Sequence, residues 1–214
     1  MQYWIFGHTG SGYIEISNLI EHADNVYPAD GQKLWKNVDR NFKKRQIGWM
    51  PPRWVNIYGL FEAPQPDFDP SDYILNPVYL KLLEEGKNTV IPAHYRQYLN
   101  YIDLVPFKDT ITKDMHKIFV SSSDKQRMIN DIAVNHPNLT DQDKIKAQAE
   151  IIDYNPLTMQ YFKPEGGYDT IIELERVWED WNYLNNILTA IGINLQKKFY
   201  DTYMEKSNAM RSRS

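Results

Sequence analysis

The sequence predicts a three-layer α/β fold, in which helices flank a mostly parallel β-sheet. Short apolar runs of strand length alternate along the chain with longer amphipathic stretches of helix length. A glycine-rich turn at residues 7–12 joins the first apolar run to the first helical stretch, as in many folds of this class. With 214 residues, of which 42% are hydrophobic, the chain suits one substantial core. We therefore expect a single domain spanning residues 1–214.

The apolar runs have the length and composition of buried strands. They are YWIF from Tyr3, NTVIPA from Asn88, KIFV from Lys117 and YDTIIEL from Tyr168. The run WVNIYGL from Trp54 is a candidate fifth strand.

Helical stretches lie between these runs. YIEISNLIEHA follows the first strand, and NPVYLKLLEEG ends at Gly86, a residue suited to a helix C-terminus. The stretch from Thr140 begins with a capping-box arrangement, because Asp143 follows three residues later. Finally, ERVWEDWNYLNNILTAIG predicts one long helix that ends at Gly192.

Ligands of such sheets bind at the carboxyl ends of the strands. We therefore expect the catalytic or ligand-binding residues directly after Phe6, Ile91 and Val120.

Composition excludes several classes of function. The formal net charge of −4 argues against a general nucleic-acid-binding protein, which needs a clustered excess of Lys and Arg. The absence of cysteine excludes disulfides, thiolate zinc sites and cysteine nucleophiles. No apolar run approaches the roughly 18 residues of a membrane helix, and the N-terminus lacks the pattern of a signal peptide. We expect a cytoplasmic protein that does not bind membranes.

The glycine-rich turn matches part of a phosphate-binding motif. Gly7 and Gly12 have the spacing of the two glycines in G-x-x-x-x-G-K-[ST]. Tyr13 stands at the lysine position, and Ile14 stands at the position of the magnesium-binding hydroxyl. These two residues argue against a magnesium-dependent nucleotide triphosphatase.

The backbone part of the motif remains. Gly10 and Gly12 permit tight turning, Thr9 and Ser11 offer hydroxyls, and the positive end of the next helix faces the loop. Because the lysine is missing, anion binding should be weak unless another cation, such as His8 or Arg96, replaces it. The alternative is a turn that only joins strand to helix.

The segment FGHTGSGYIEISNLIEH resembles the 5′-phosphosulfate-binding loop of the sulfotransferase family, G-x-x-[RK]-S-G-[ST]-[ST]. Gly7, Ser11, Gly12 and the stretch SNLI fit that pattern. Gly10 stands in place of its basic residue, and Tyr13 and Ile14 replace its hydroxyls.

Three further segments resemble the family in the same order. NTVIPAHY is similar to the strand that precedes the catalytic histidine, which would be His94. HKIFVSSSDKQRMIND resembles the strand, loop and helix that contact the 3′-phosphate; Ser122 or Ser123 occupies the place of an arginine, and Asp131 the place of a serine. IIELERVWEDWNYLNNILTAIGI is similar to the family's C-terminal helix.

The resemblance implies a sulfotransferase-like fold, related to that of P-loop nucleotide triphosphatases. It implies transfer of a sulfuryl group from 3′-phosphoadenosine 5′-phosphosulfate to a hydroxyl acceptor, with His94 as the base and no metal. The candidate cations are Arg53, Arg96, Lys108 and His8. The implied donor-binding residues are Gly7, His8, Thr9, Gly10, Ser11, Gly12, Tyr13, Ser122 and Ser123.

Two other functions fit the sequence. One is a non-catalytic descendant of the same fold that serves as a binding or structural protein, for instance in a virus or phage. The other is a degenerate nucleotide kinase, which Tyr13 and Ile14 disfavour. An enzyme would bind a small nucleotide donor and a hydroxyl acceptor, a structural protein would bind a protein partner, and a viral protein would reside in the host cytoplasm.

Overall fold

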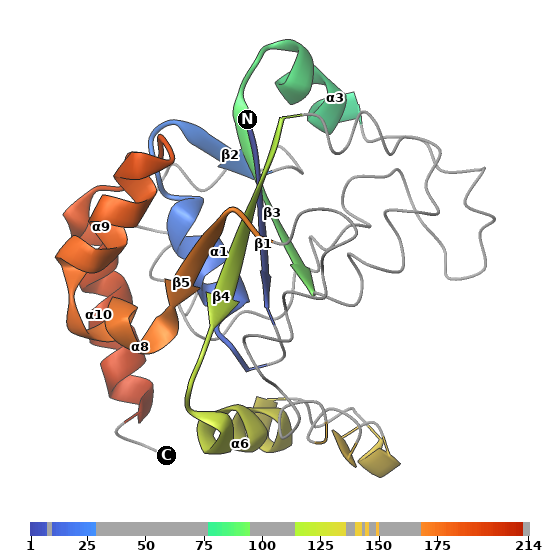
Figure 1. Cartoon of the computed structure of the whole chain (residues 1–214), viewed down its shortest axis with the longest axis vertical. Coiled ribbons are helices and arrows are strands. Elements are labelled where there is room, and N and C mark those ends of the chain that lie inside the picture. Colours follow the sequence, from blue (N-terminus) through green and yellow to red (C-terminus); the bar gives the residue numbers. More distant parts are fainter. Residues whose placement is uncertain are drawn as a thin grey trace.

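The computed structural model describes residues 1–7, 10–28, 77–94, 114–135, 140–142, 144–145, 149 and 168–211. These residues form a five-stranded sheet in the order β2-β3-β1-β4-β5, and every neighbouring pair of strands is parallel (Figure 1). The strands are β1 (Gln2–Gly7), β2 (Val26–Pro28), β3 (Asn88–His94), β4 (Met115–Ser121) and β5 (Thr170–Glu173). The helices are α1 (Tyr13–Ile20), α3 (Pro77–Glu84), α6 (Lys125–Asn135), α8 (Leu174–Glu179), α9 (Trp181–Ala190) and α10 (Lys197–Arg211).

The predicted fold class is confirmed, since a parallel sheet is flanked by helices. The four apolar runs that predict strands correspond to β1, β3, β4 and β5. Strand β2 was not predicted, because three residues are too few to show a periodic pattern. The candidate strand from Trp54 lies outside the described residues, and the helix predicted from Thr140 is described only in part.

The strand order places a topological switch point between β1 and β4. From β1 the chain continues to β2 on one side of the sheet, whereas from β4 it continues to β5 on the other side. In open α/β sheets, ligands bind outside the carboxyl ends of the strands at such a point. Figure 1 shows these ends at the lower edge of the sheet, with α6 beneath them.

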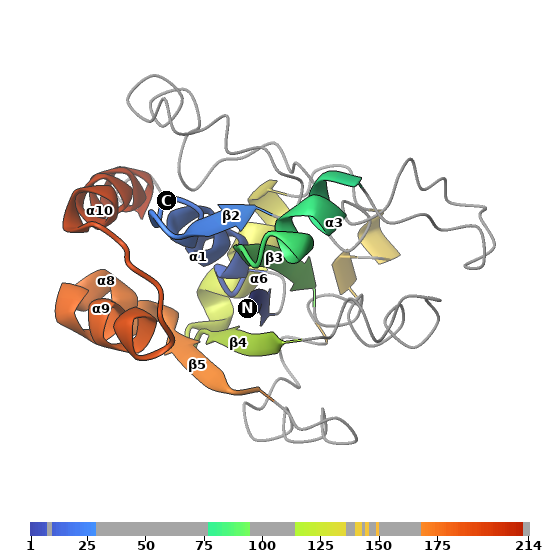
Figure 2. The same cartoon turned by 90° about the horizontal axis from the view of Figure 1, so that it is seen from above.

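Strand β1 is buried on both faces, as its uninterrupted apolar sequence predicts. Tyr3 and Ile5 face the main core, which also includes residues of α1. On the opposite face, the Tyr79 hydroxyl of α3 donates a hydrogen bond to the Gln2 side-chain carbonyl. Figure 2 shows α1, α9 and α10 on one side of the strands and α3 on the other side.

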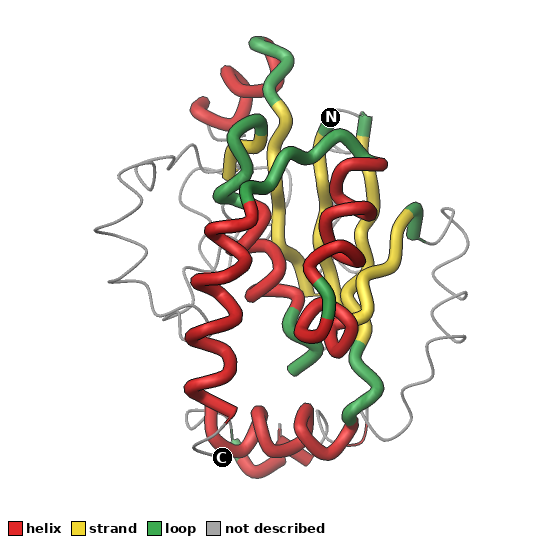
Figure 3. The backbone as a smooth tube through the Cα atoms, turned by 90° about the vertical axis from the view of Figure 1, so that its left-hand side faces the viewer, coloured by secondary structure: helices red, strands yellow, loops and turns green. Residues whose placement is uncertain are grey.

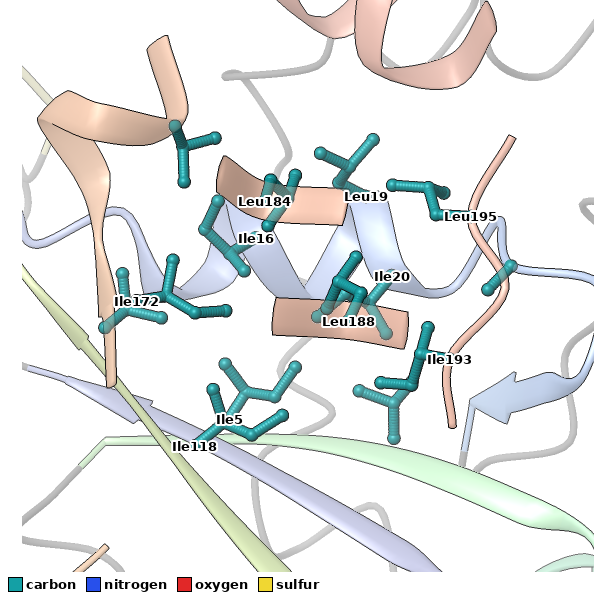
Figure 4. Packing of buried hydrophobic residues seen from close by; sticks show 14 of the residues in the cluster. Ile5, Ile16, Leu19, Ile20, Ile118, Ile172, Leu184, Leu188, Ile193 and Leu195 are labelled. Carbon is teal, nitrogen blue, oxygen red and sulfur yellow. The ribbon is translucent and has the colours of Figure 1, made fainter. Parts of the chain in front are cut away.

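The main core lies where α1 is enclosed by the sheet, α9 and the segment that follows α9. Ile16, Leu19 and Ile20 of α1 contact this core together with Leu184 and Leu188 of α9 (Figure 4). Figure 3 shows the helices of this face in front of the strands. Each fully buried leucine or isoleucine stabilises the fold by about 1.5–3 kcal/mol, so this contact holds α9 on the domain.

The prediction of one long helix up to Gly192 was wrong in one respect, because the chain breaks at Asp180. This residue is extended, with φ −142° and ψ 110°, and it separates α8 from α9. Its carboxylate accepts a hydrogen bond of 2.8 Å from the Asn182 amide and so caps α9. Asp side chains compete with helical hydrogen bonds in this way, and apolar periodicity does not reveal the break. The predicted end at Gly192 agrees with its φ of +81°.

No helix in the described part of the chain is both long and apolar enough to cross a membrane.

The α9 contact can be tested by truncating one leucine. Leu188 is 0% exposed, so Leu188→Ala should lower the free energy of unfolding by about 2–5 kcal/mol. Urea denaturation followed by circular dichroism would measure the change. Thr189→Ala is the matched control, since Thr189 is exposed and its loss should cost less than about 0.5 kcal/mol. Equal losses in the two variants would contradict the packing of α9.

Candidate functional site

The first residue of the glycine-rich loop and the predicted base, His94, lie at the same level of the sheet. Gly7 is the last residue of β1, and its partner in the parallel register is His94, the last residue of β3. Neighbouring strands are about 4.8 Å apart, so the two backbones are close. The placement of the His94 side chain, and of all of His8 and Thr9, lies outside the description.

Gly10 and Gly12 have left-handed backbone conformations, with φ values of +77° and +81°. Both are also tightly enclosed. A Cβ atom on Gly10 would lie 2.9 Å from Met128 Cα of α6, and one on Gly12 would lie 2.6 Å from Leu174 Cδ2 of α8. Both glycines are therefore favoured by backbone conformation, and Gly10 is also required by the close approach of the α6 backbone, whereas the Leu174 side chain beside Gly12 can shift.

Gly7 is enclosed in a similar way by the loop itself and by β4. A Cβ atom there would lie 2.2 Å from Ser11 Oγ and 2.7 Å from the Val120 carbonyl oxygen. Ser11 is 0% exposed, and its hydroxyl has no hydrogen-bond partner among the described residues. The Ser11 hydroxyl thus lies inside the turn, beside Gly7.

The amino end of α1 faces this loop. Gly12 is its N-cap residue, and no side chain caps the helix there. The first turn carries Glu15, whose carboxylate accepts a hydrogen bond of 3.0 Å from the Tyr203 hydroxyl of α10. Burial raises the pKa of Tyr203, so the phenol stays protonated and remains a donor. The described contacts therefore tie Glu15 to α10.

Tyr13, which stands at the lysine position of the nucleotide-binding motif, belongs to the main core. Its side chain is buried, and burial raises the pKa of its phenol. The side chain at this position therefore brings no charge to the loop, and only the backbone of Tyr13 remains suited to contact an anion.

Ser122 and Ser123 follow β4 at the same edge and contact Glu175 of α8. The Ser122 hydroxyl donates a hydrogen bond of 2.5 Å to Glu175 Oε1, and the Ser123 amide donates a longer one of 3.3 Å to Oε2. The two serines that the resemblance assigns to the donor thus hold a carboxylate of the protein itself.

Sequence reasoning missed Arg127, which joins the same group. Its Nη2 atom donates a hydrogen bond of 2.9 Å to Ser122 Oγ, and its guanidinium lies 5.0 Å from the ring centre of Trp178. Asp124 caps α6 by accepting a hydrogen bond of 2.8 Å from the Arg127 amide. The resemblance places the family's arginine at Ser122 or Ser123. The signal that could have identified Arg127 was therefore a basic residue about one helical turn after these serines.

The other candidate cations, Arg53, Arg96 and Lys108, lie outside the described residues. Asp131 is on α6, and its side chain is not described. Within the described ranges, no three His, Asp or Glu residues form a group that could hold a metal ion.

Comparison with protein-family models and with curated proteins gives no match. Among solved structures, the chain is similar to an uncharacterized protein from Eubacterium ventriosum, with 14% identity, a TM-score of 0.34, and coverage of 81% of this chain and 88% of that chain. It is also similar to TT1252 from Thermus thermophilus, with 12% identity, a TM-score of 0.34, and coverage of 81% and 87%. Likenesses at these values support no inference about function.

The packing of the loop against α6 can be tested at Gly10. Gly10→Ala should lower the free energy of unfolding by about 2 kcal/mol or more, because it adds a clash with the Met128 backbone to the cost of a left-handed alanine. Gly86→Ala is the matched control: its φ is +64°, nothing lies within 4 Å of the added Cβ, and only the backbone cost of about 1–2 kcal/mol applies. Thermal and urea unfolding would measure both. A Gly10 variant no less stable than the Gly86 variant would contradict the close contact with α6.

Proposed function

We propose that this chain is a sulfotransferase-like protein. It binds 3′-phosphoadenosine 5′-phosphosulfate at residues 7–13 and at Ser122 and Ser123, and it transfers the sulfuryl group to a hydroxyl acceptor. In this proposal His94 is the base, and the donor is a substrate that is consumed in the reaction.

The register of β1 and β3 is the observation that best supports the proposal. It brings Gly7 and His94, which are far apart in the sequence, to neighbouring positions at the carboxyl edge of the sheet. This edge includes the switch point between β1 and β4, where ligands of open α/β sheets bind. Two segments assigned to one reaction by resemblance thus meet where a ligand is expected.

The proposed chemistry uses few groups. His94 takes the proton from the acceptor hydroxyl, whose oxygen attacks the sulfur atom of the donor. The bond between sulfur and the bridging phosphate oxygen breaks, and adenosine 3′,5′-bisphosphate leaves. The loop amides and the positive end of α1 stabilise the negative charge that grows on the leaving phosphate.

The backbone of the loop is suited to bind an anion, but its described residues supply no positive charge. Gly10 and Gly12 allow the backbone amides to approach a phosphate closely, but the described part of the loop, Gly7 and 10–13, has no basic residue. Binding then depends on amide dipoles and on cations from elsewhere, and its affinity should be modest.

The burial of Tyr13 favours the second candidate, a non-catalytic protein of the same fold. With a core side chain at the lysine position, the loop can keep its backbone conformation without binding or transferring an anionic group. Such a protein would act through a protein partner, for instance in a virus or phage. The same residue, together with Ile14, makes the nucleotide kinase the weakest of the three alternatives.

We also propose a cytoplasmic location, or the host cytoplasm for a viral protein, because the chain has no cysteine and its donor is a free nucleotide.

The role of His94 can be tested by turnover. His94→Ala should reduce the release of adenosine 3′,5′-bisphosphate from the donor by about 10²–10⁴-fold, because the variant lacks a group that accepts the proton. The assay would use an aliphatic alcohol such as ethanol as the acceptor, because its hydroxyl keeps its proton at neutral pH and needs a base. Calorimetry would confirm that the variant still binds the bisphosphate.

His22→Ala is the control for this test, since His22 follows the C-cap residue Glu21, at the end of α1 opposite to the glycine-rich loop, and stacks on Phe199. It should turn over at the wild-type rate. Equal turnover by the His94 and His22 variants would rule out His94 as the base, and a wild-type protein without turnover would favour the non-catalytic alternative.

A further inference from the structure

Arg127 forms no direct ion pair with a carboxylate in the described part of the chain. Its hydrogen bond goes to the neutral hydroxyl of Ser122, its guanidinium stacks on Trp178, and none of the ion pairs found there includes it. Its Nε atom is buried and has no hydrogen-bond partner among these residues. The nearest carboxylate in the hydrogen-bond network, that of Glu175, reaches Arg127 only through the Ser122 hydroxyl. A buried donor on a cation without a direct anionic acceptor suits an anionic ligand.

Glu175 accepts hydrogen bonds from the two donors that lie beside Arg127. Its two carboxylate oxygens accept hydrogen bonds from the Ser122 hydroxyl, at 2.5 Å, and from the Ser123 amide, at 3.3 Å. A serine hydroxyl has one proton to donate, so Ser122 cannot donate to a ligand while Glu175 holds it. A phosphate or sulfate oxygen would take the same two donors, because carboxylates and these oxyanions are bound by the same groups.

Both charged residues lie next to residues that enclose the glycine-rich loop. Met128, which follows Arg127, lies against Gly10, and Leu174, which precedes Glu175, lies against Gly12. The loop, Arg127 and Glu175 therefore share the carboxyl edge of the sheet. Glu175 is in the first turn of α8 and only partly buried, so rotation of its side chain frees the donors without unfolding the helix.

We propose that Ser122, the Ser123 amide and Arg127 form an oxyanion site, and that Glu175 is an internal competitor that occupies it in the unliganded protein. A phosphate or sulfate group displaces the Glu175 carboxylate, receives the two hydrogen bonds and pairs with Arg127. As a component of the ligand site, this inference rests on the proposed function, and it identifies a cation in the segment that resembles the family's 3′-phosphate contacts. Glu175 then makes the site select doubly charged groups over weaker anions.

Inorganic sulfate tests this site without a nucleotide. Calorimetric titration with sodium sulfate, at an ionic strength held constant with sodium chloride, gives the sulfate response of each variant, that is its binding heat and affinity. Melting temperatures would not serve, because sulfate also stabilises folded proteins generally. Glu175→Gln should raise this affinity about tenfold, because a neutral amide competes less well than a carboxylate for the serine donors. Glu179→Gln is its control: it removes the same charge from an exposed position at the end of α8 and should change nothing.

Arg127→Met should abolish the sulfate response, while the methionine still covers Trp178. Arg176→Met is its control, since Arg176 is exposed and pairs with Glu173 at 3.4 Å. Should Arg127→Met not fold, Arg127→Lys keeps the charge but loses the forked donor, and it should weaken sulfate binding about tenfold. The proposal is overturned if Glu175→Gln responds like Glu179→Gln, or if the folded Arg127 variant responds like Arg176→Met.

Titration of the same variants with adenosine 3′,5′-bisphosphate separates this inference from the proposed function. A sulfate response that follows the prediction, without any binding of the bisphosphate, supports the oxyanion site and refutes the nucleotide. Bisphosphate binding that is equal in wild type, Glu175→Gln and Arg127→Met supports the nucleotide and refutes the role of these two residues.

Discussion

The burial of β1 between two parallel neighbours is the constraint on which the rest of the structure depends. All of its residues are buried, with one face against the α1 core and the other face toward α3, and it pairs with both β3 and β4. Because β1 is held on every side, its last residue, Gly7, has a defined position at the carboxyl edge. The glycine-rich loop begins there, and its described glycines, Gly7, Gly10 and Gly12, have β4, α6 and α8 as close neighbours.

Because of this close packing, the backbone conformation of the loop does not depend on whether the loop binds a charged ligand. Gly7 and Gly10 are required because a Cβ atom at either would lie within 3 Å of a backbone atom, and Gly10 and Gly12 are favoured by their positive φ. Packing and backbone conformation thus explain the three glycines, whether or not the loop binds an anion. A ligand is proposed from other features, namely the pairing of Gly7 with His94 and the buried Nε atom of Arg127, which has no hydrogen-bond partner among the described residues.

The sequence predicts well those features that a local pattern encodes. Strands β1, β3, β4 and β5 are apolar runs, and Gly86 and Gly192 end helices because each adopts a positive φ. The break at Asp180 was missed, because a capping hydrogen bond outweighs helical periodicity there. The role of Glu175 beside the predicted Ser122 was also missed, because this contact joins side chains about 50 residues apart, which the pairing of β4 with β5 brings together.

The most direct test of the account is a calorimetric titration of the wild-type protein with adenosine 3′,5′-bisphosphate, with ATP and magnesium as the comparison. The account predicts that the bisphosphate binds with a dissociation constant in the micromolar range, equivalent to about −8 kcal/mol, and that ATP with magnesium binds more weakly. Absence of heat with the bisphosphate would contradict it, and would mean that residues 7–12 form a packed turn and not a nucleotide site.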